Sequence, residues 1–394
     1  AAPARYGLAW QHYRAGRHRA AADAFAKVRG TGDTLGTQAT YYEAVNRALL
    51  GASEQALRLY RTYLQNAKDE RLATEARYEA GLLLYRQENY REAAATLRPL
   101  TAASAPSERR GDALYWLGNA YLASDRLDRA LDAYAQAIEQ GAAPPSVTAE
   151  VRFQRAWALY QNGRYAEAAP LFRTLAQKYP DTERGREALF WGGDAAYQQG
   201  QYDRARALLR RYLDAAPAGS RRAGAQYALA WTHFKQRNFE PAARLFRTVV
   251  QADAELPDTG IPYRQDARLR LADCYFALKR YDDAIAAYEQ VDGSGTDYAL
   301  YQAGKALYFA GRPADALSRL QRFADRSPDS PFRPDALYRI GDIHFQQQRY
   351  QAAREAFRRL LDAYPDDPRA SEAQYAIGDS YYNAGNMEDA VGAY

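Results

Sequence analysis

Apolar residues recur every three or four positions along most of the chain, in stretches separated by short polar breaks. In "YQAAREAFRRLLDAY", residues 350–364, the apolar positions fall on one stripe of a helix: Tyr350, Ala353, Phe357, Leu360, Leu361 and Tyr364. A similar stretch precedes it, and polar turns such as "QQGQ" (198–201) join the two members of a pair. The pattern predicts helical hairpins.

The hairpin is repeated along the chain at a nearly constant interval. An alanine of the predicted second helix recurs eleven times, usually 37 residues apart, at Ala21, Ala56, Ala93, Ala130, Ala168, Ala205, Ala242, Ala284, Ala316, Ala353 and Ala390. Twelve residues before it stands the small residue of the predicted first helix: Ala9, Ala44, Gly81, Gly118, Ala156, Gly193, Ala230, Ala272, Gly304, Gly341 or Gly378. Two small residues at fixed separation indicate closely packed helices. A lone hairpin cannot bury its apolar stripe, so the repeats must stack into a solenoid.

The repeated motif resembles the tetratricopeptide repeat over essentially the whole chain. It has a small residue, an aromatic residue after it, the alanine twelve positions on, then Phe, Tyr or Leu four beyond, and often a closing proline. The opening "A-x-Y-x-x-G" and closing "YP-D" are similar to repeats of Gram-negative envelope proteins, such as Tol-Pal-associated repeat proteins and barrel-assembly lipoproteins. This resemblance implies an all-α, right-handed superhelical solenoid of about eleven hairpins.

The spacing also predicts how the solenoid is divided. The interval between Ala242 and Ala284 is 42 residues and the next is only 32. We therefore expect N-terminal repeats over residues 1–251, an irregular insertion with a kink over 252–265, and C-terminal repeats over 266–394, the last one truncated.

Composition narrows the class of protein. Hydrophobic residues make up 47% of 394 residues without a run long enough to cross a membrane, which is typical of a folded domain. The 53 basic and 48 acidic residues give a net charge of +5 spread along the chain, which argues against nucleic acid as a partner. The chain begins "AAPARYGLAW", so we expect any signal segment or lipid anchor to lie upstream.

Aromatic residues of the first helices are the main candidates for binding. They lie three residues before the small residue and four after it, positions that share a helix face, while tryptophans follow the small residue directly in three repeats. In this family the first helices line the concave face. The candidate aromatic contacts are Tyr115, Phe153, Trp157, Tyr160, Phe190, Tyr197, Tyr227, Trp231 and Phe234. Alternatively, these rings pack between neighbouring first helices.

Aspartates occupy the tryptophan position in four other repeats: Asp194, Asp273, Asp342 and Asp379. They predict an acidic lining suited to a basic partner, since Lys305 alone offers a positive charge at that position. Acidic residues in the first turns of the helices, such as Glu75, are explained by the helix dipole.

No motif indicates catalysis. The sequence lacks HExxH, GxSxG and a phosphate-binding loop, and the single Cys274 excludes a cysteine-based zinc site. We expect neither enzyme activity nor a metal or cofactor. The function that fits is a protein-interaction scaffold of the bacterial envelope, periplasmic or bound to the outer membrane, with a cytoplasmic location left open. The alternative is a carbohydrate-contacting component of a cell-wall or polysaccharide export system that uses the same aromatic residues.

Overall fold

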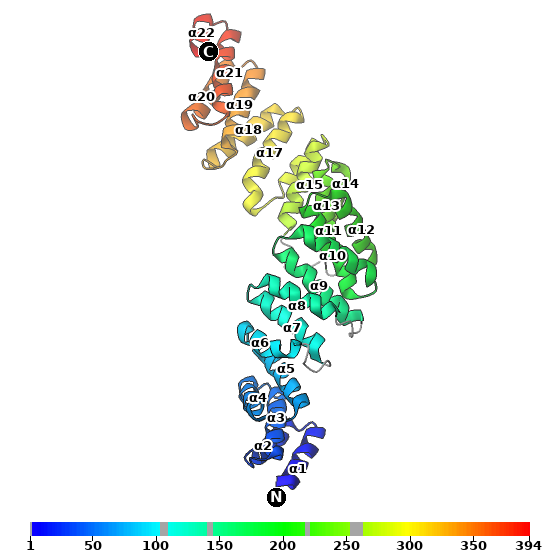
Figure 1. Ribbon diagram of the computed structural model, residues 1–394. Helices are drawn as coiled ribbons and strands as arrows, with labels where there is room; N and C mark the ends of the chain where they lie inside the picture. Colours follow the sequence, from blue (N-terminus) through cyan, green and yellow to red (C-terminus); the bar gives the residue numbers. More distant parts are fainter. Residues whose placement is uncertain (1, 103–108, 140–144, 217–220, 253–262) are drawn as a thin grey trace. The chain divides into compact units, whose positions relative to one another are not determined.

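The computed structural model describes residues 2–102, 109–139, 145–216, 221–252 and 263–394. All regular structure in these ranges is helical (Figure 1). The helices of residues 1–199 are α1 (Ala2–Arg14), α2 (His18–Arg29), α3 (Thr34–Leu49), α4 (Ser53–Asn66), α5 (Glu70–Arg86), α6 (Tyr90–Leu97), η1 (Arg98–Thr101), α7 (Arg110–Ala123), α8 (Leu127–Glu139), α9 (Pro145–Gln161), α10 (Tyr165–Lys178) and α11 (Glu183–Gln198). Those of residues 200–394 are α12 (Tyr202–Ala215), α13 (Arg222–Lys235), α14 (Phe239–Ala252), α15 (Arg264–Ala277), α16 (Tyr281–Tyr288), η3 (Gly293–Gly295), α17 (Thr296–Phe309), α18 (Pro313–Arg326), α19 (Arg333–Gln346), α20 (Tyr350–Ala363), α21 (Arg369–Asn383) and α22 (Met387–Ala393).

Contacts divide the chain into two units, residues 1–199 and 200–394. Within each unit every helix packs against the next one along the chain. First helices also contact the first helix of the following repeat, as α5 does with α7, α9 with α11, and α19 with α21. The predicted hairpins and their consecutive stacking are thereby confirmed, and the described residues form a solenoid of helical pairs.

The small residue of a first helix provides space for one large side chain of its partner helix, as is seen at Gly81, Gly118, Gly304, Gly341 and Gly378. This closing residue stands sixteen positions later, on the second helix. A Cβ added to Gly341 would lie 2.5 Å from Cε1 of Phe357, and one on Gly81 would lie 2.5 Å from Cδ2 of Leu97. All closing residues before the last repeat are buried: Phe25, Tyr60, Leu97, Tyr134, Phe172, Leu209, Phe246, Tyr288, Leu320 and Phe357. Each contributes about 1.5–3 kcal/mol by burial.

One turn geometry ends all the first helices. The residue seven positions after the small residue has a positive φ in every repeat, between 60° and 84°. Glycine occupies this position in six repeats and adopts the conformation without steric cost, whereas Glu88, Asp125, Arg237, Lys279 and Gln348 carry a Cβ there. The left-handed residue is therefore a structural requirement of the hairpin that glycine meets best.

Replacing Gln348 by glycine should stabilise the protein by about 1 kcal/mol, because it removes the steric cost of a left-handed residue with a Cβ. Replacing Gly311, at the equivalent position with φ of 75°, by alanine should destabilise it by about the same amount. Denaturant unfolding followed by circular dichroism measures both changes. Equal, same-sign shifts for the two variants would contradict this role of the turn.

The predicted insertion and the predicted closing prolines can be located only in part. The predicted insertion at 252–265 falls mainly on residues 253–262, which lie outside the described residues, as does Pro217. Pro180, Pro328 and Pro365 each lie two residues after the end of a second helix. Within the described ranges, none of the helices combines the length and the apolar character that crossing a bilayer requires.

Candidate interaction surface on the first helices

The aromatic residue three positions before the small residue is covered by the following repeat. The covering residue lies at or near the start of the next first helix, nine positions before its small residue. Phe332 stacks on Tyr301 with ring centroids 5.9 Å apart, and Tyr263 stacks on Tyr227 at 4.7 Å. In several other repeats an arginine takes this place, whereas Leu35, Leu72 and Gly295 stand there in others. These rings therefore stabilise the stack of hairpins.

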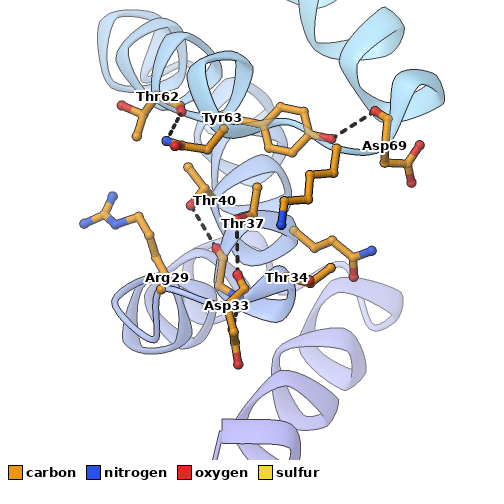
Figure 2. Close-up of a pocket in the computed structure, with 13 residues that line it drawn as sticks. Arg29, Asp33, Thr34, Thr37, Thr40, Thr62, Tyr63 and Asp69 are labelled. Carbon is orange, nitrogen blue, oxygen red and sulfur yellow. Dashed lines mark hydrogen bonds between the residues drawn. The ribbon is translucent and has the colours of Figure 1, made fainter.

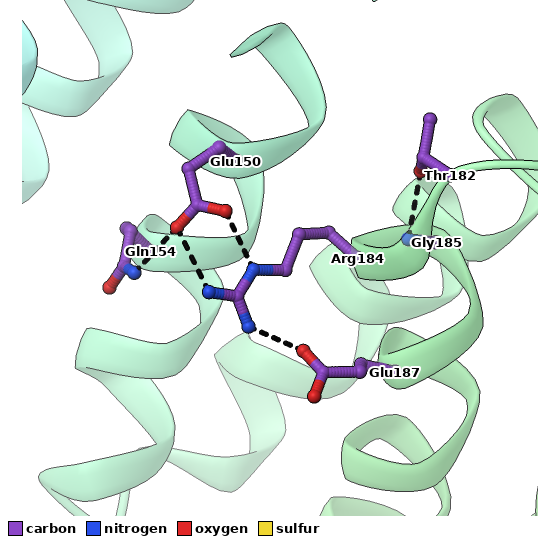
Figure 3. Close-up of polar contacts among 6 residues, drawn as sticks. All are labelled: Glu150, Gln154, Thr182, Arg184, Gly185 and Glu187. Atoms are coloured by element: carbon purple, nitrogen blue, oxygen red, sulfur yellow. Dashed lines mark hydrogen bonds and ion pairs between the residues drawn. The ribbon is translucent and has the colours of Figure 1, made fainter. Parts of the chain in front are cut away.

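Three of the covering residues are arginines that join consecutive repeats, and we call them bridging arginines: Arg109, Arg184 and Arg369. The guanidinium of Arg184 lies 4.5 Å from the ring centre of Phe153 in the preceding repeat. Its Nε donates to Glu150 Oε2 at 2.6 Å, and its Nη1 pairs with Glu187 of its own repeat (Figure 3). One side chain thus connects both acidic residues and a ring.

The same geometry recurs at the other two bridging arginines. Arg109 lies over Tyr78 at 4.8 Å and pairs with Glu75 at 2.8 Å and Asp112 at 3.4 Å. Its hydrogen bonds to Glu75 raise the pKa of the Arg109 guanidinium. Arg369 lies over Tyr338 at 5.3 Å and pairs with Asp335 and Glu372. In these repeats the first-turn acids hold neighbouring repeats together, a role beyond complementing the helix dipole.

Arg184→Ala should lower stability by about 1–2 kcal/mol, because it removes a partly buried, multidentate pair together with the contact to Phe153. Arg173, exposed on α10 with no ion pair among the described residues, provides the matched control, and Arg173→Ala should cost less than about 0.5 kcal/mol. Lysine at position 184 keeps the charge but loses the fork geometry, so it should recover only part of the loss. If Arg184→Lys were as stable as the natural protein, the bridging geometry would be contradicted. Thermal unfolding measures all three variants.

The tryptophans pack on a specific partner in the next repeat. Trp157 on α9 lies 4.3 Å from Trp191 on α11, centre to centre, and Trp10 lies 4.6 Å from Tyr42. Arg270 places its guanidinium 5.3 Å from the centre of the Trp231 ring. The partner always stands two positions before the next small residue. In these three repeats the partner is aromatic or arginine, but Leu82 and Lys305 stand at the tryptophan position opposite Trp116 and Arg339, so the partner alone does not decide which repeats carry tryptophan.

The four aspartates fall into two groups. Asp273 accepts hydrogen bonds from Tyr288 at 2.7 Å and Tyr298 at 3.2 Å and pairs with Arg270 at 2.7 Å. Asp379 likewise accepts from Tyr394 at 2.6 Å. In both repeats the closing residue is tyrosine, and the aspartate satisfies its hydroxyl group. Burial raises the pKa of Asp273, against the effect of its donors.

The other two aspartates contact polar groups nearer the surface. Asp342 pairs with Arg339 at 2.7 Å and accepts from Gln346 at 3.1 Å, with a quarter of its side chain exposed. Asp194 accepts a hydrogen bond from the hydroxyl of Tyr160 and lies 3.5 Å from Nε2 of Gln198. Both are half-buried.

The predicted site residues differ in how far they reach the surface. Phe153 and Phe190 are buried, at 4% and 8% exposure, so their rings belong to the core. The others are half-buried: Tyr115, Trp157, Tyr160, Asp194, Tyr197, Tyr227, Trp231, Phe234, Asp273, Asp342 and Asp379. The aromatic residues four positions after the small residue contact the start of the second helix, as Tyr160 does with Tyr165 at 5.2 Å and Phe234 with Phe239 at 5.6 Å.

The structure brings together one compact aromatic cluster, which we call the α9–α11 cluster: Trp157, Tyr160 and Trp191. Tyr160 lies 5.3 Å from Trp157 and 5.0 Å from Trp191, centre to centre. The two glutamines that flank it, Gln161 and Gln198, are exposed. Trp191 was not among the site residues predicted from the sequence. The signal was available, since Tyr42, Trp116 and Trp191 all stand two positions before a small residue.

A polar pocket of about 820 Å³ lies at the edge of the second repeat, where α3 begins and α4 ends (Figure 2). Asp33 accepts from the backbone N–H of Gly36 at 2.8 Å, and Asp69 accepts from that of Leu72 at 3.1 Å. The hydroxyl of Thr40 donates to the carbonyl of Gly36. These groups are occupied in holding the helix ends, and no sequence motif pointed to this pocket.

Among the residues that the structure describes, no group of three or more His, Cys, Asp or Glu side chains is placed to bind a metal ion. Cys274 is buried, which raises the pKa of its thiol to about 12 and keeps it protonated.

Comparison with protein families agrees with this architecture. A model described as tetratricopeptide repeat matches residues 78–147, 153–220, 227–299 and 301–368, and two further models of that repeat match residues 2–27 and 372–394. The chain belongs to the tetratricopeptide repeat family. Tetratricopeptide repeat proteins are generally protein-interaction scaffolds. A search of curated proteins found no match to the sequence.

Solved structures similar to this tetratricopeptide repeat chain share little sequence with it. MamA is 20% identical, with 44% of this chain and 89% of MamA covered and a TM-score of 0.36. The C-terminal part of a repeat protein from Cytophaga hutchinsonii is 15% identical, with coverage of 75% and 98% and a TM-score of 0.46. YrrB, described as a TPR protein with an unusual peptide-binding site, is 17% identical, with coverage of 52% and 97% and a TM-score of 0.40.

Proposed function

We propose that this protein is a non-enzymatic scaffold of the bacterial cell envelope that binds a segment of a protein partner on the concave face expected for its first helices. The α9–α11 cluster carries the proposal. Its two tryptophans and one tyrosine are half-buried, unlike the fully buried closing residues, and Asp194 and the exposed Gln161 and Gln198 adjoin them. Aromatic side chains with such polar surroundings are typical hot spots of protein interfaces.

A protein segment fits this cluster better than a sugar does. Stacking on a sugar requires a free ring face. Trp157 lies nearly parallel to Phe153 and Tyr160, at interplanar angles of 15° and 10°, and also contacts Trp191. A ring with three aromatic neighbours suits contacts with apolar side chains better than stacking on a sugar. Carbohydrate binding remains the alternative that competition experiments address.

Site-specific photo-crosslinking tests the face and the class of partner together. A photoreactive residue at Gln161, beside the α9–α11 cluster, should capture one defined protein from an envelope extract, and the purified partner should bind the chain directly. The matched control carries the same residue at Arg173, exposed on the second helix α10. Capture from position 173 but not 161, or competition by cell-wall saccharides instead of the partner, would overturn the proposal.

The envelope location is tested separately. Fractionation of cells that express the full-length natural protein should place it with periplasmic or outer-membrane markers, as the envelope-type repeat motifs lead us to expect. Recovery with cytoplasmic markers would contradict the location and leave the crosslinking result to decide the binding face.

A further inference from the structure

Positive charge is concentrated in one short part of the chain. The whole protein carries a net charge of +5, but residues 200–251 contain ten arginine and lysine residues and only three acidic ones. These residues form α12, α13 and α14. The even distribution of charge inferred from the sequence therefore does not hold locally.

Four arginines of this region make up what we call the basic seam: Arg210, Arg211, Arg237 and Arg244. All four are exposed, and none is within ion-pairing distance of a carboxylate among the described residues. The nearby acids do not neutralise them. Asp203 pairs with Arg206 at 2.6 Å, and Asp214, although exposed on α12, makes no ion pair with described residues.

His233 shows that arginines from two helices converge. The ring is 5% exposed, at the C-terminal end of α13. Burial lowers the pKa of His233, and so do the nearby charges of Arg206 and Arg210 on α12 and Arg244 on α14. Arg206 also reaches Gln236 at 2.8 Å, which fixes α12 against the end of α13. Arg210 and Arg244 thus approach the same ring from α12 and α14, while Arg211 and Arg237 belong to the seam as exposed neighbours in sequence of Arg210 and Gln236.

In one other repeat a carboxylate neutralises the equivalent arginine. Arg61 occupies the position in its repeat that Arg210 occupies in its own, and it pairs with Glu92 of the following repeat. The residue equivalent to Glu92 next to Arg210 is Pro241. Arginines on two other second helices, Arg319 and Arg359, also pair with an acid of the preceding repeat, Glu289 and Asp325. Arg98 and Arg173, at the same repeat position, also have no carboxylate partner among the described residues. What distinguishes Arg210 is therefore its grouping with Arg211, Arg237 and Arg244.

We propose that the basic seam is a second docking surface, which binds an acidic segment of a protein through its carboxylates. Arginine presents a planar fork that matches carboxylate geometry, and the pair of Arg61 with Glu92 shows that a carboxylate fits at this repeat position. Two other polyanions fit less well. Residues 221–251 and 200–216 expose no large apolar side chain to enter a membrane, and no exposed ring there offers a base-stacking platform for single-stranded nucleic acid.

Binding of three labelled probes to the whole chain tests this proposal. Poly-L-glutamate should bind at physiological salt more tightly than poly(U) or vesicles of phosphatidylcholine and phosphatidylglycerol, and its affinity should fall as salt rises. The double variant Arg210→Glu, Arg244→Glu should weaken poly-L-glutamate binding by about tenfold or more. The control Arg91→Glu, Arg173→Glu changes the net charge equally at exposed second-helix positions outside the seam and should change binding less than about twofold.

The outcomes separate the alternatives. Preference for poly(U) or for vesicles, or equal losses in the two double variants, would overturn the acidic-segment proposal. Circular dichroism checks that each variant is folded, and both substitutions of each pair are at exposed positions. Crosslinking from position 161 should be unchanged in the variant Arg210→Glu, Arg244→Glu. The probe-binding experiment therefore tests the basic seam alone, and the crosslinking experiment tests the first-helix surface alone.

Discussion

Replacing Phe357 by alanine should lower the free energy of unfolding by about 3–5 kcal/mol, because it removes a fully buried ring and leaves a cavity. Phe357 is 1% exposed, fills the space above Gly341, and lies 5.5 Å from Tyr338 of the first helix. Denaturant unfolding followed by circular dichroism measures the loss. A broader transition is also expected, since repeats are coupled mainly through their neighbours.

Phe309 provides the matched control for this substitution. It is 45% exposed at the end of α17, so Phe309→Ala should cost about 1 kcal/mol or less. A second test adds a Cβ at Gly341, on the first helix opposite Phe357. Gly341→Ala should destabilise the natural chain by about 1–3 kcal/mol and be nearly neutral when Phe357 is already alanine. Additive losses would show that the two residues do not share the hairpin contact.

Removing the carboxylate of Asp273 should be the second severe change, with Asp273→Ala lowering stability by about 3 kcal/mol. The side chain is 11% exposed, and its loss leaves the hydroxyls of Tyr288 and Tyr298 without their acceptor. Unfolding experiments should also show that Tyr288→Phe together with Asp273→Ala costs less than the sum of the two single changes.

Asp342 occupies the same repeat position as Asp273 and serves as its control. Its closing residue is Phe357, which offers no hydroxyl, and its carboxylate pairs with Arg339 at a partly exposed site. Asp342→Ala should therefore cost about 1 kcal/mol or less. Equal losses at the two positions would contradict the distinction between a buried hydrogen-bond acceptor and a surface charge.

The fold could be predicted almost completely from the sequence, because its main contacts repeat. The recurrence of small residues identified the hairpins and their order, and the structure confirms both. The common turn was missed, although its left-handed residue recurs at a fixed position. Five of its eleven members are not glycine, so residue type alone did not reveal a conformation that only the backbone angles display.

The candidate surface was less predictable, because helix periodicity gives the side of a helix and not what covers it. Trp157 and Phe153 share a face, yet Arg184 from the next repeat covers Phe153 and leaves Trp157 half-buried. The role predicted for the first-turn acids, complementing the helix dipole, was likewise incomplete. An arginine three positions before each of Asp112, Glu187 and Glu372 was visible in the sequence, but its second partner lies in the preceding repeat.

The sequence by itself determined that this protein is a stack of helical hairpins, since periodic apolar stripes and recurrent small residues depend on contacts repeated in every unit. Only the tertiary structure decided which polar and aromatic side chains are used to join the repeats and which remain available. That choice depends on pairs such as Trp157 with Trp191, Asp273 with Tyr288, and Arg184 with Glu150. Such pairs differ from repeat to repeat and form only when neighbouring helices are in place.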